Sequence, residues 1–184
     1  HRGVTSVALE INIGKIRSVK GARQTFELET DTFDFMVPDW QLSKPLSVSL
    51  EVVNEGRYLS LAGTVKTTVE GRCSRCLDKV TQTVETVLAE QLLYAKDAYL
   101  YDHLAVGELE EQFYLYENDL FDISEIVRES ILAALPMKIL CRDDCRGLCL
   151  KCGQNLNRGQ CDCDTTEIDP RLAILAKLKA TEEV

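Results

Sequence analysis

Eight cysteines constrain this chain more than any other feature of its sequence, because they occur in groups. Cys73 and Cys76 form one pair with two residues between them. The other six lie close together nearer the C-terminus: Cys141, Cys145, Cys149, Cys152, Cys161 and Cys163. A pair spaced in this way can direct both sulfurs at one ion from a tight turn, and structural zinc takes four such ligands in a tetrahedron. The cysteines therefore predict two closed zinc sites.

The spacing indicates which four cysteines share each ion. Cys149 and Cys152 are followed by Cys161 and Cys163 after a short loop, residues 153–160, whose glycines and asparagines allow it to fold back. We assign these four to one site, the C-terminal tetrad. The other four form the split tetrad, whose members are far apart in sequence: Cys73, Cys76, Cys141 and Cys145. Spacing alone leaves open a swapped arrangement with Cys141, Cys145, Cys149 and Cys152 on one ion.

Other uses of the cysteines fit the sequence less well. Disulfide bonds need an oxidising compartment, and no apolar run follows His1 to indicate a signal peptide, so we expect a cytoplasmic protein. A redox C-x-x-C normally accompanies a β-α-β pattern, whereas Cys73 and Cys76 join two strand-like runs. No stretch approaches the ~20 apolar residues of a membrane span, so we expect no membrane partner.

The residues of a catalytic zinc site are also missing from the sequence. Such a site has three protein ligands and an open position, and a nucleobase deaminase adds an H-x-E motif. Neither His1 nor His103 has a glutamate two residues further on, and we interpret His103 as a surface residue. The chain contains no Walker loop, G-x-S-x-G or glycine-rich dinucleotide motif. We therefore predict no catalytic residues and no enzymatic activity.

The charge balance limits how the chain could contact nucleic acid. The formal net charge is −9, and four thiolates around each zinc ion would make it more negative. This argues against non-specific binding through bulk charge, so RNA contact would need a local basic patch. The candidate RNA-binding residues flank the split tetrad: Arg72, Arg75, Arg142 and Arg146. The alternative is that these arginines only offset the thiolates and the nearby Asp143 and Asp144.

Hydrophobic periodicity predicts a mainly β arrangement in the first half of the chain. Apolar and polar residues alternate in three long runs: 46–52, 58–71 and 80–94. Their short connections are typical of an antiparallel β meander. Shorter runs near residues 7–11 and 26–29 are typical of further strands. The acidic, aromatic stretch 95–118 predicts a loop that leads into one strand near 112–117.

Capping patterns predict two helices. Asp122 and Glu125 form a capping-box pattern ahead of apolar residues at helical spacing, and Pro136 ends this one long helix. Asp169 and Pro170 mark the start of a second helix near the C-terminus.

These patterns together predict an α+β fold with an antiparallel β meander packed with one long helix, plus a C-terminal cysteine-rich zinc module. We expect an α+β core domain over residues 1–140, which includes the Cys73–Cys76 turn. The zinc module and the terminal helix would occupy residues 141–184.

Three segments of the sequence together resemble the YceD family of large ribosomal RNA subunit accumulation proteins. They are Arg72-Cys73-Ser74-Arg75-Cys76-Leu77, the predicted helix from Ile123 to Pro136, and the stretch that runs from Gly147-Leu148-Cys149 through Asn155-Leu156-Asn157 to Asp169-Pro170-Arg171. The resemblance covers the middle and the C-terminal half, whereas residues 1–40 match only in general character.

The resemblance implies a bacterial or plastid protein needed for accumulation of 23S ribosomal RNA, which acts in large-subunit assembly or rRNA processing without a known catalytic activity. Its implied partners are 23S rRNA or the pre-ribosomal large subunit, and a ribosomal protein. We thus expect a non-enzymatic ribosome-biogenesis factor with structural zinc. One alternative is an adaptor whose acidic face docks a ribosomal protein or assembly factor. The least favoured alternative is a metal-dependent RNA hydrolase, which requires an open metal position.

Overall fold

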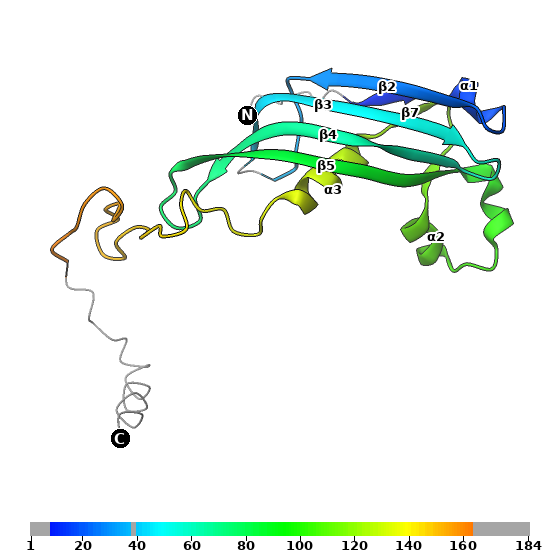
Figure 1. Ribbon diagram of the computed structural model, residues 1–184. Helices are drawn as coiled ribbons and strands as arrows, with labels where there is room; N and C mark the ends of the chain where they lie inside the picture. Colours follow the sequence, from blue (N-terminus) through cyan, green and yellow to red (C-terminus); the bar gives the residue numbers. More distant parts are fainter. Residues whose placement is uncertain (1–7, 38–39, 164–184) are drawn as a thin grey trace. The chain divides into compact units, whose positions relative to one another are not determined.

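The computed structural model describes residues 8–37 and 40–163 and divides the chain into two compact units (Figure 1). The sheet unit comprises His1–Arg72 and Lys79–Ile139. The cysteine unit comprises Cys73–Asp78 and Leu140–Val184, so the turn after the fourth strand groups with the C-terminal part of the chain. A division into folding domains at residue 140 stays a prediction.

The sheet unit is built on a five-stranded sheet with the strand order β2-β3-β4-β5-β6. Its strands are β2 (Arg23–Thr30), β3 (Gln41–Asn54), β4 (Leu59–Arg72), β5 (Lys79–Tyr94) and β6 (Tyr114–Tyr116). Strands β2 to β5 are antiparallel neighbours and lie side by side in Figure 1, which confirms the predicted antiparallel meander for this part of the sheet.

One face of the sheet is buried because successive side chains on a strand point to opposite faces. The inward positions of β3 are at most 1% exposed: Leu46, Val48, Leu50 and Val52. Helix α3 (Ser124–Ala134) contributes Ile126, Val127 and Ile131 to the same hydrophobic core. Sheet and helix therefore share a single hydrophobic cluster.

Three short elements complete this core. Strand β1 (Glu10–Asn12) pairs antiparallel with β7 (Leu120–Asp122) in a separate two-stranded sheet. Helix α1 (Gly14–Arg17) follows β1 and is tied to the end of β3, because the Asn54 amide donates to the carbonyls of Ile16 and Arg17, each at 2.9 Å.

The predicted long helix is shorter than expected. Helix α3 has 11 residues, about three turns. Its N-cap is Ile123, and the Asp122 carboxylate accepts the Ser124 N–H at 2.8 Å, so the capping box predicted from Asp122 lies one residue too early. The helix ends at Ala134 because Pro136 disfavours the helical conformation for Leu135, which is extended with ψ 139°.

The strand predicted near residues 112–117 is confirmed by β6, but the stretch before it was predicted only as a loop. Residues 95–113 are not a plain loop but contain a 3₁₀ helix, η1 (Ala95–Tyr101), and helix α2 (Val106–Gln112). They carry the chain back so that β6 pairs parallel with β5, and the sheet is mixed. Parallel pairing needs a long crossover, and this one is held by the rings of Tyr101 and Phe113, 4.8 Å apart.

Two sequence predictions lie outside the described residues, namely the helix that starts at Asp169 and the beginning of the first predicted strand at Val7. In the part of the chain that is described, no helix has the length and apolar character needed to cross a membrane.

Candidate metal centre

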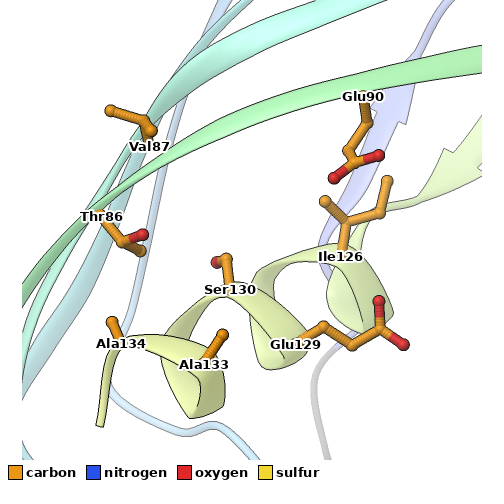
Figure 2. Close-up of a pocket in the computed structure, with 8 residues that line it drawn as sticks. All are labelled: Thr86, Val87, Glu90, Ile126, Glu129, Ser130, Ala133 and Ala134. Atoms are coloured by element: carbon orange, nitrogen blue, oxygen red, sulfur yellow. The ribbon is translucent and has the colours of Figure 1, made fainter.

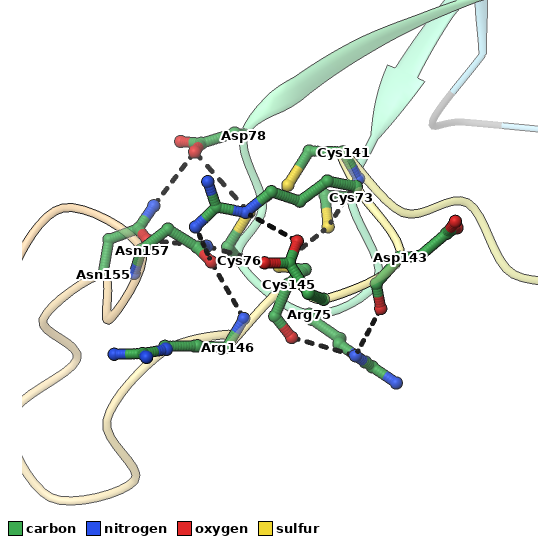
Figure 3. Close-up of polar contacts among 12 residues, drawn as sticks. Cys73, Arg75, Cys76, Asp78, Cys141, Asp143, Cys145, Arg146, Asn155 and Asn157 are labelled. Atoms are coloured by element: carbon green, nitrogen blue, oxygen red, sulfur yellow. Dashed lines mark hydrogen bonds and ion pairs between the residues drawn. The ribbon is translucent and has the colours of Figure 1, made fainter.

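Four sulfurs of the cysteine unit meet at the split tetrad (Figure 3). Cys73 and Cys76 lie in the turn between β4 and β5, and Cys141 and Cys145 lie in irregular chain beyond α3. All four sulfurs are within 4.8 Å of one another. Sequence analysis grouped the same four residues, and the swapped arrangement that spacing left open is not the one that the structure forms.

The sulfur geometry suits one tetrahedral ion. Sulfurs about 2.3 Å from a zinc ion are about 3.8 Å apart in a regular tetrahedron. The Sγ atoms of Cys73 and Cys145 are 3.8 Å apart, and those of Cys76 and Cys141 are 3.5 Å apart. These distances are much longer than the ~2.05 Å of a disulfide, and all eight cysteines are free. The split tetrad could therefore hold a metal ion.

A second set of sulfurs has the same character. Those of the C-terminal tetrad also lie within 4.8 Å of one another: Cys149, Cys152, Cys161 and Cys163. This tetrad is more open to solvent, since only Cys149 is buried and Cys152 is exposed. No further group of three or more metal-ligating side chains occurs within residues 8–37 and 40–163. Two sites that could each bind a metal ion are thus formed.

The two C-x-x-C turns share one backbone design. In each, the N–H four residues after the first cysteine donates to that cysteine's carbonyl, from Leu77 to Cys73 at 3.0 Å and from Gly153 to Cys149 at 2.9 Å. The first cysteine's own N–H donates to the carbonyl five residues on, at 2.8 Å in both turns. These bonds close the chain around the pair and direct both sulfurs to one side.

Backbone amides favour the ionised form of the first cysteine in each turn. Burial alone would raise the pKa of the Cys73 thiol, but backbone N–H groups of Cys76, Arg75 and Cys141 outweigh it and lower the pKa to about 6. At Cys149 the backbone N–H groups of Cys152 and Lys151 lower the pKa to about 6. The first cysteine of each turn therefore favours the thiolate, which is the metal-binding form of cysteine.

Two asparagines from the loop of the C-terminal tetrad lie beside the split tetrad (Figure 3). Asn157 donates through Nδ2 to the Cys145 sulfur at 3.3 Å and accepts the Arg146 N–H through Oδ1 at 2.8 Å. Asn155 donates to the Asp78 carboxylate at 3.0 Å. Contacts made by the loop of the C-terminal tetrad therefore connect the two tetrads. Sequence analysis interpreted both asparagines as turn residues and assigned them no contact with the split tetrad.

The candidate RNA-binding arginines have different surroundings. Arg75 donates to the backbone carbonyl of Cys145 at 2.9 Å. Arg142 donates to Asn157 Oδ1 at 2.8 Å and forms an ion pair with Asp144 at 3.3 Å. Arg146 is exposed in the same unit, and Arg72 is the exposed last residue of β4 in the sheet unit. Arg75 and Arg142 thus already support the tetrad, whatever else they bind.

The cysteine unit has almost no conventional core. Within residues 73–78 and 140–163, the buried apolar side chains are all cysteines: Cys73, Cys76, Cys145 and Cys149. A segment with so little apolar burial normally needs cross-links or metal ions to fold. The candidate metal ligands are therefore also the centre of this unit's packing.

Comparisons with known proteins identify relatives of this chain. The chain is 26% identical over 164 residues to "Large ribosomal RNA subunit accumulation protein YCED homolog 1, chloroplastic" of Arabidopsis thaliana, with 78% of this chain and 51% of the relative covered. An uncharacterized protein of Mycobacterium tuberculosis strain H37Rv is 30% identical over 137 residues, 74% of this chain and 62% of that protein. The chain thus spans about half to three-fifths of the length of these two relatives.

A shorter relative matches along most of its length. The uncharacterized protein YlbN of Bacillus subtilis is 26% identical over 161 residues, which cover 85% of this chain and 89% of that protein. No solved structure matches this chain. The family model described as "Large ribosomal RNA subunit accumulation protein YceD" matches residues 61–179, well over half of the chain, and includes all eight cysteines. The chain therefore belongs to the YceD family.

Proposed function

We propose that each tetrad holds one structural Zn²⁺ ion and that this protein is a non-enzymatic factor in formation of the large ribosomal subunit, acting on 23S rRNA or a pre-ribosomal particle. Family membership and the name of the Arabidopsis relative support the role. The metal proposal depends on one observation, the convergence of Cys73 and Cys76 with Cys141 and Cys145, which are widely separated in sequence.

The donor set favours a structural over a catalytic ion. Four sulfurs fill a tetrahedron and leave no position for water or substrate. When bound, zinc would cross-link the turn between β4 and β5 to the chain beyond α3 and stabilise the thiolates. The backbone amides, Asn157 and Arg75 then fix the ligand orientation, as outer-shell groups do at metal sites. These residues would hold a surface in shape and would take no part in chemistry on a substrate.

The surface so shaped would be the RNA contact. Arg75, Arg142 and Arg146 belong to the cysteine unit, and Arg72 immediately precedes Cys73. Guanidinium groups bind phosphate oxygens with two parallel hydrogen bonds when their position is fixed. A chain with a net charge of −9 would repel RNA elsewhere, which would confine contact to this region.

Metal analysis per chain tests the zinc proposal. We expect two zinc ions per chain after purification under reducing conditions. The pair Cys73→Ser with Cys76→Ser should leave one, and so should Cys161→Ser with Cys163→Ser. Cobalt substitution provides a second readout, because tetrahedral Co²⁺ with four sulfur ligands has a characteristic visible spectrum. Protein that takes up no metal when zinc is supplied would contradict the proposal.

Binding to fragments of 23S rRNA tests the RNA proposal. Arg72→Ala with Arg146→Ala is the informative variant, because Arg75 and Arg142 also hold the tetrad and their loss would confuse the result. We expect affinity to fall and the salt dependence to flatten by about 0.7–0.9 per lost phosphate contact. The matched control is Arg23→Ala with Arg57→Ala, which removes two exposed arginines of the sheet unit. Equal effects of both variants would contradict a local site.

The two other candidate functions differ in their readouts. An adaptor that docks a ribosomal protein or assembly factor would retain its partner after ribonuclease treatment, whereas an RNA-bound factor would not. A metal-dependent RNA hydrolase would cleave rRNA and lose that activity on chelation. Four sulfurs at each ion, measured by X-ray absorption, would remove the hydrolase.

A further inference from the structure

Strand β5 has a long free edge. One side of β5 pairs with β4 from Leu92 back to Lys79. The other side pairs with β6 only at Leu92–Tyr94, which leaves residues 79–91 without a strand neighbour on that side among the described residues. An unpaired edge presents a row of N–H and C=O groups, and proteins usually block it with proline, a bulge or a covering element. Within residues 79–91, β5 contains no proline and pairs with β4 without a bulge.

A groove runs beside this edge, between β5 and α3 (Figure 2). Its volume is about 410 Å³, which lies in the range of roughly 300–1,000 Å³ found for ligand pockets. Thr86 and Glu90 project from β5 toward the helix, and Ile126 and Ser130 project from α3 toward the strand. The side chains of Ala133 and Ala134 are small and exposed, so the helix leaves room for a further chain.

The groove is acidic. Glu90 and Glu129 line it, and none of the described residues that line it is basic. The Tyr114 hydroxyl donates a hydrogen bond of 2.6 Å to the Glu129 carboxylate and holds it at the rim of the groove. Burial and then the charge of Glu129 raise the pKa of Glu90, which shows that the two carboxylates are close enough to repel each other. A positive side chain placed here would gain attraction from both groups.

We propose that this groove binds an extended, basic segment of a partner protein, which adds to the free edge of β5 as a further strand and places a lysine or arginine beside Glu90 and Glu129. Main-chain hydrogen bonds would supply affinity, and the carboxylates and Ile126 would select the side chains, as in other cases of strand addition beside a helix. The proposal depends on the proposed function only where it names the partner, a basic protein of the large subunit. The groove itself is tested without it.

Synthetic peptides test the proposal on the whole 184-residue chain as purified. The probe is a terminally blocked peptide of alternating lysine and valine, and the control peptide has glutamate in place of lysine. We expect the basic peptide to protect β5 amides between residues 81 and 91 from hydrogen exchange and the acidic one not to do so. Two N-methylated versions, modified at odd or at even positions, should differ sharply, because only every second N–H of a strand faces a neighbour.

Groove variants supply the second arm. Ala133→Trp should fill the groove and weaken peptide binding at least tenfold. The matched control is Ala89→Trp, at an exposed alanine on the opposite face of β5 from Glu90. Glu90→Gln should weaken binding severalfold and lessen its salt dependence, whereas Glu125→Gln, one turn before Glu129 and outside the groove, should not.

Several results would overturn the proposal. They are no binding at millimolar peptide, protection on β2 in place of β5, equal binding of the acidic peptide, and equal loss with Ala133→Trp and Ala89→Trp. A dimer that Ala133→Trp dissociates would identify the occupant as a second copy of this chain and would also refute it. If the peptide binds as expected while 23S rRNA binding or metal content fails its own test, the groove stands and the proposed function falls.

Discussion

Leu77 and Gly153 occupy the same position in the two C-x-x-C turns, with φ angles of 61° and 73°. Each follows the second cysteine of its pair and donates its N–H to the carbonyl of the first. Glycine adopts this left-handed conformation freely, whereas leucine does so at a cost. Met36 is the one other non-glycine residue with positive φ in the described part of the chain. The turn of the split tetrad is therefore strained where its C-terminal counterpart is relaxed.

Replacement of Leu77 by glycine should strengthen metal retention at the split tetrad. The left-handed conformation costs a leucine about 1–2 kcal/mol, and the greater freedom of glycine in the unfolded chain gives back part of this, about 0.4–1 kcal/mol. Leu77 is 54% exposed, so little buried area is lost. We expect a net gain of roughly 1 kcal/mol, or about a fivefold higher affinity for zinc in equilibrium competition with a chelator.

The reciprocal variant, Gly153→Leu, is the control. A Cβ at Gly153 meets no atom within 4 Å, so the effect of the substitution reports backbone strain and not a clash. It should weaken zinc retention at the C-terminal tetrad by a similar factor. A gain in both variants, or no change in either, would show that the φ angle does not limit metal binding.

Asn157 should matter to the split tetrad although it is not one of its ligands. Asn157→Asp replaces the N–H that reaches the Cys145 sulfur at 3.3 Å by a charged oxygen, so attraction to the thiolate becomes repulsion. Loss of an outer-shell partner typically lowers metal affinity about 10–100-fold. Competition with a chelator, followed at the split tetrad in the Cys161→Ser, Cys163→Ser background, measures this loss. Asn118→Asp, at an exposed asparagine of the sheet unit, makes the same change of charge and should have no effect.

The members of the split tetrad could be predicted because they are the four cysteines that remain once the C-terminal four are grouped together. Eight ligands divide into two sets of four, and the C-terminal four are close enough in sequence to close on themselves. The supporting contacts of Asn157 and Asp78 could not be predicted in this way, because they depend on how the loop folds back. Asn and Asp are also favoured in turns for their own backbone hydrogen bonds, so their presence does not by itself predict a contact with a metal ligand.

The sheet was likewise predicted in part. Alternation predicted β3, β4 and β5, since one buried face imposes a period of two over a long strand. The strand predicted near 112–117 is present as β6, but its parallel pairing with β5 was not predicted, because three residues carry no signal for the direction of pairing. The helix length was overestimated because the apolar spacing continues to Leu135, while Pro136 had already excluded that residue from the helix.

Gly63 should be the glycine at which the sheet tolerates no side chain. It pairs with Leu50 on β3 and Leu88 on β5, and a Cβ there would lie 2.3 Å from the Ser49 carbonyl oxygen and 2.7 Å from the Leu50 Cα. Backbone atoms of a central strand cannot move aside cheaply, so Gly63→Ala should lower the free energy of unfolding by about 1–3 kcal/mol. Urea unfolding measures this change.

Gly107 supplies the matched substitution for that test. A Cβ at this position in α2 meets nothing within 4 Å, so Gly107→Ala should leave stability unchanged or raise it by up to about 1 kcal/mol through helix propensity. If Gly63→Ala changed the free energy of unfolding as little as Gly107→Ala, β3 would not approach β4 as closely at this point as the structure shows.

Metal removal should unfold the cysteine unit and leave the sheet unit folded. The hydrophobic core of the sheet unit contains no cysteine, whereas the buried apolar side chains of the cysteine unit, within its described residues, are all cysteines of the two tetrads. Without metal, close-packed thiolates repel one another and no apolar contacts replace the lost bonds. Hydrogen exchange after treatment with a zinc chelator under reducing conditions should therefore show fast exchange over residues 140–163 and retained protection on β3 and β4. Simultaneous loss of protection in both units would mean that the sheet depends on the metal, and an unchanged cysteine unit would mean that its fold does not.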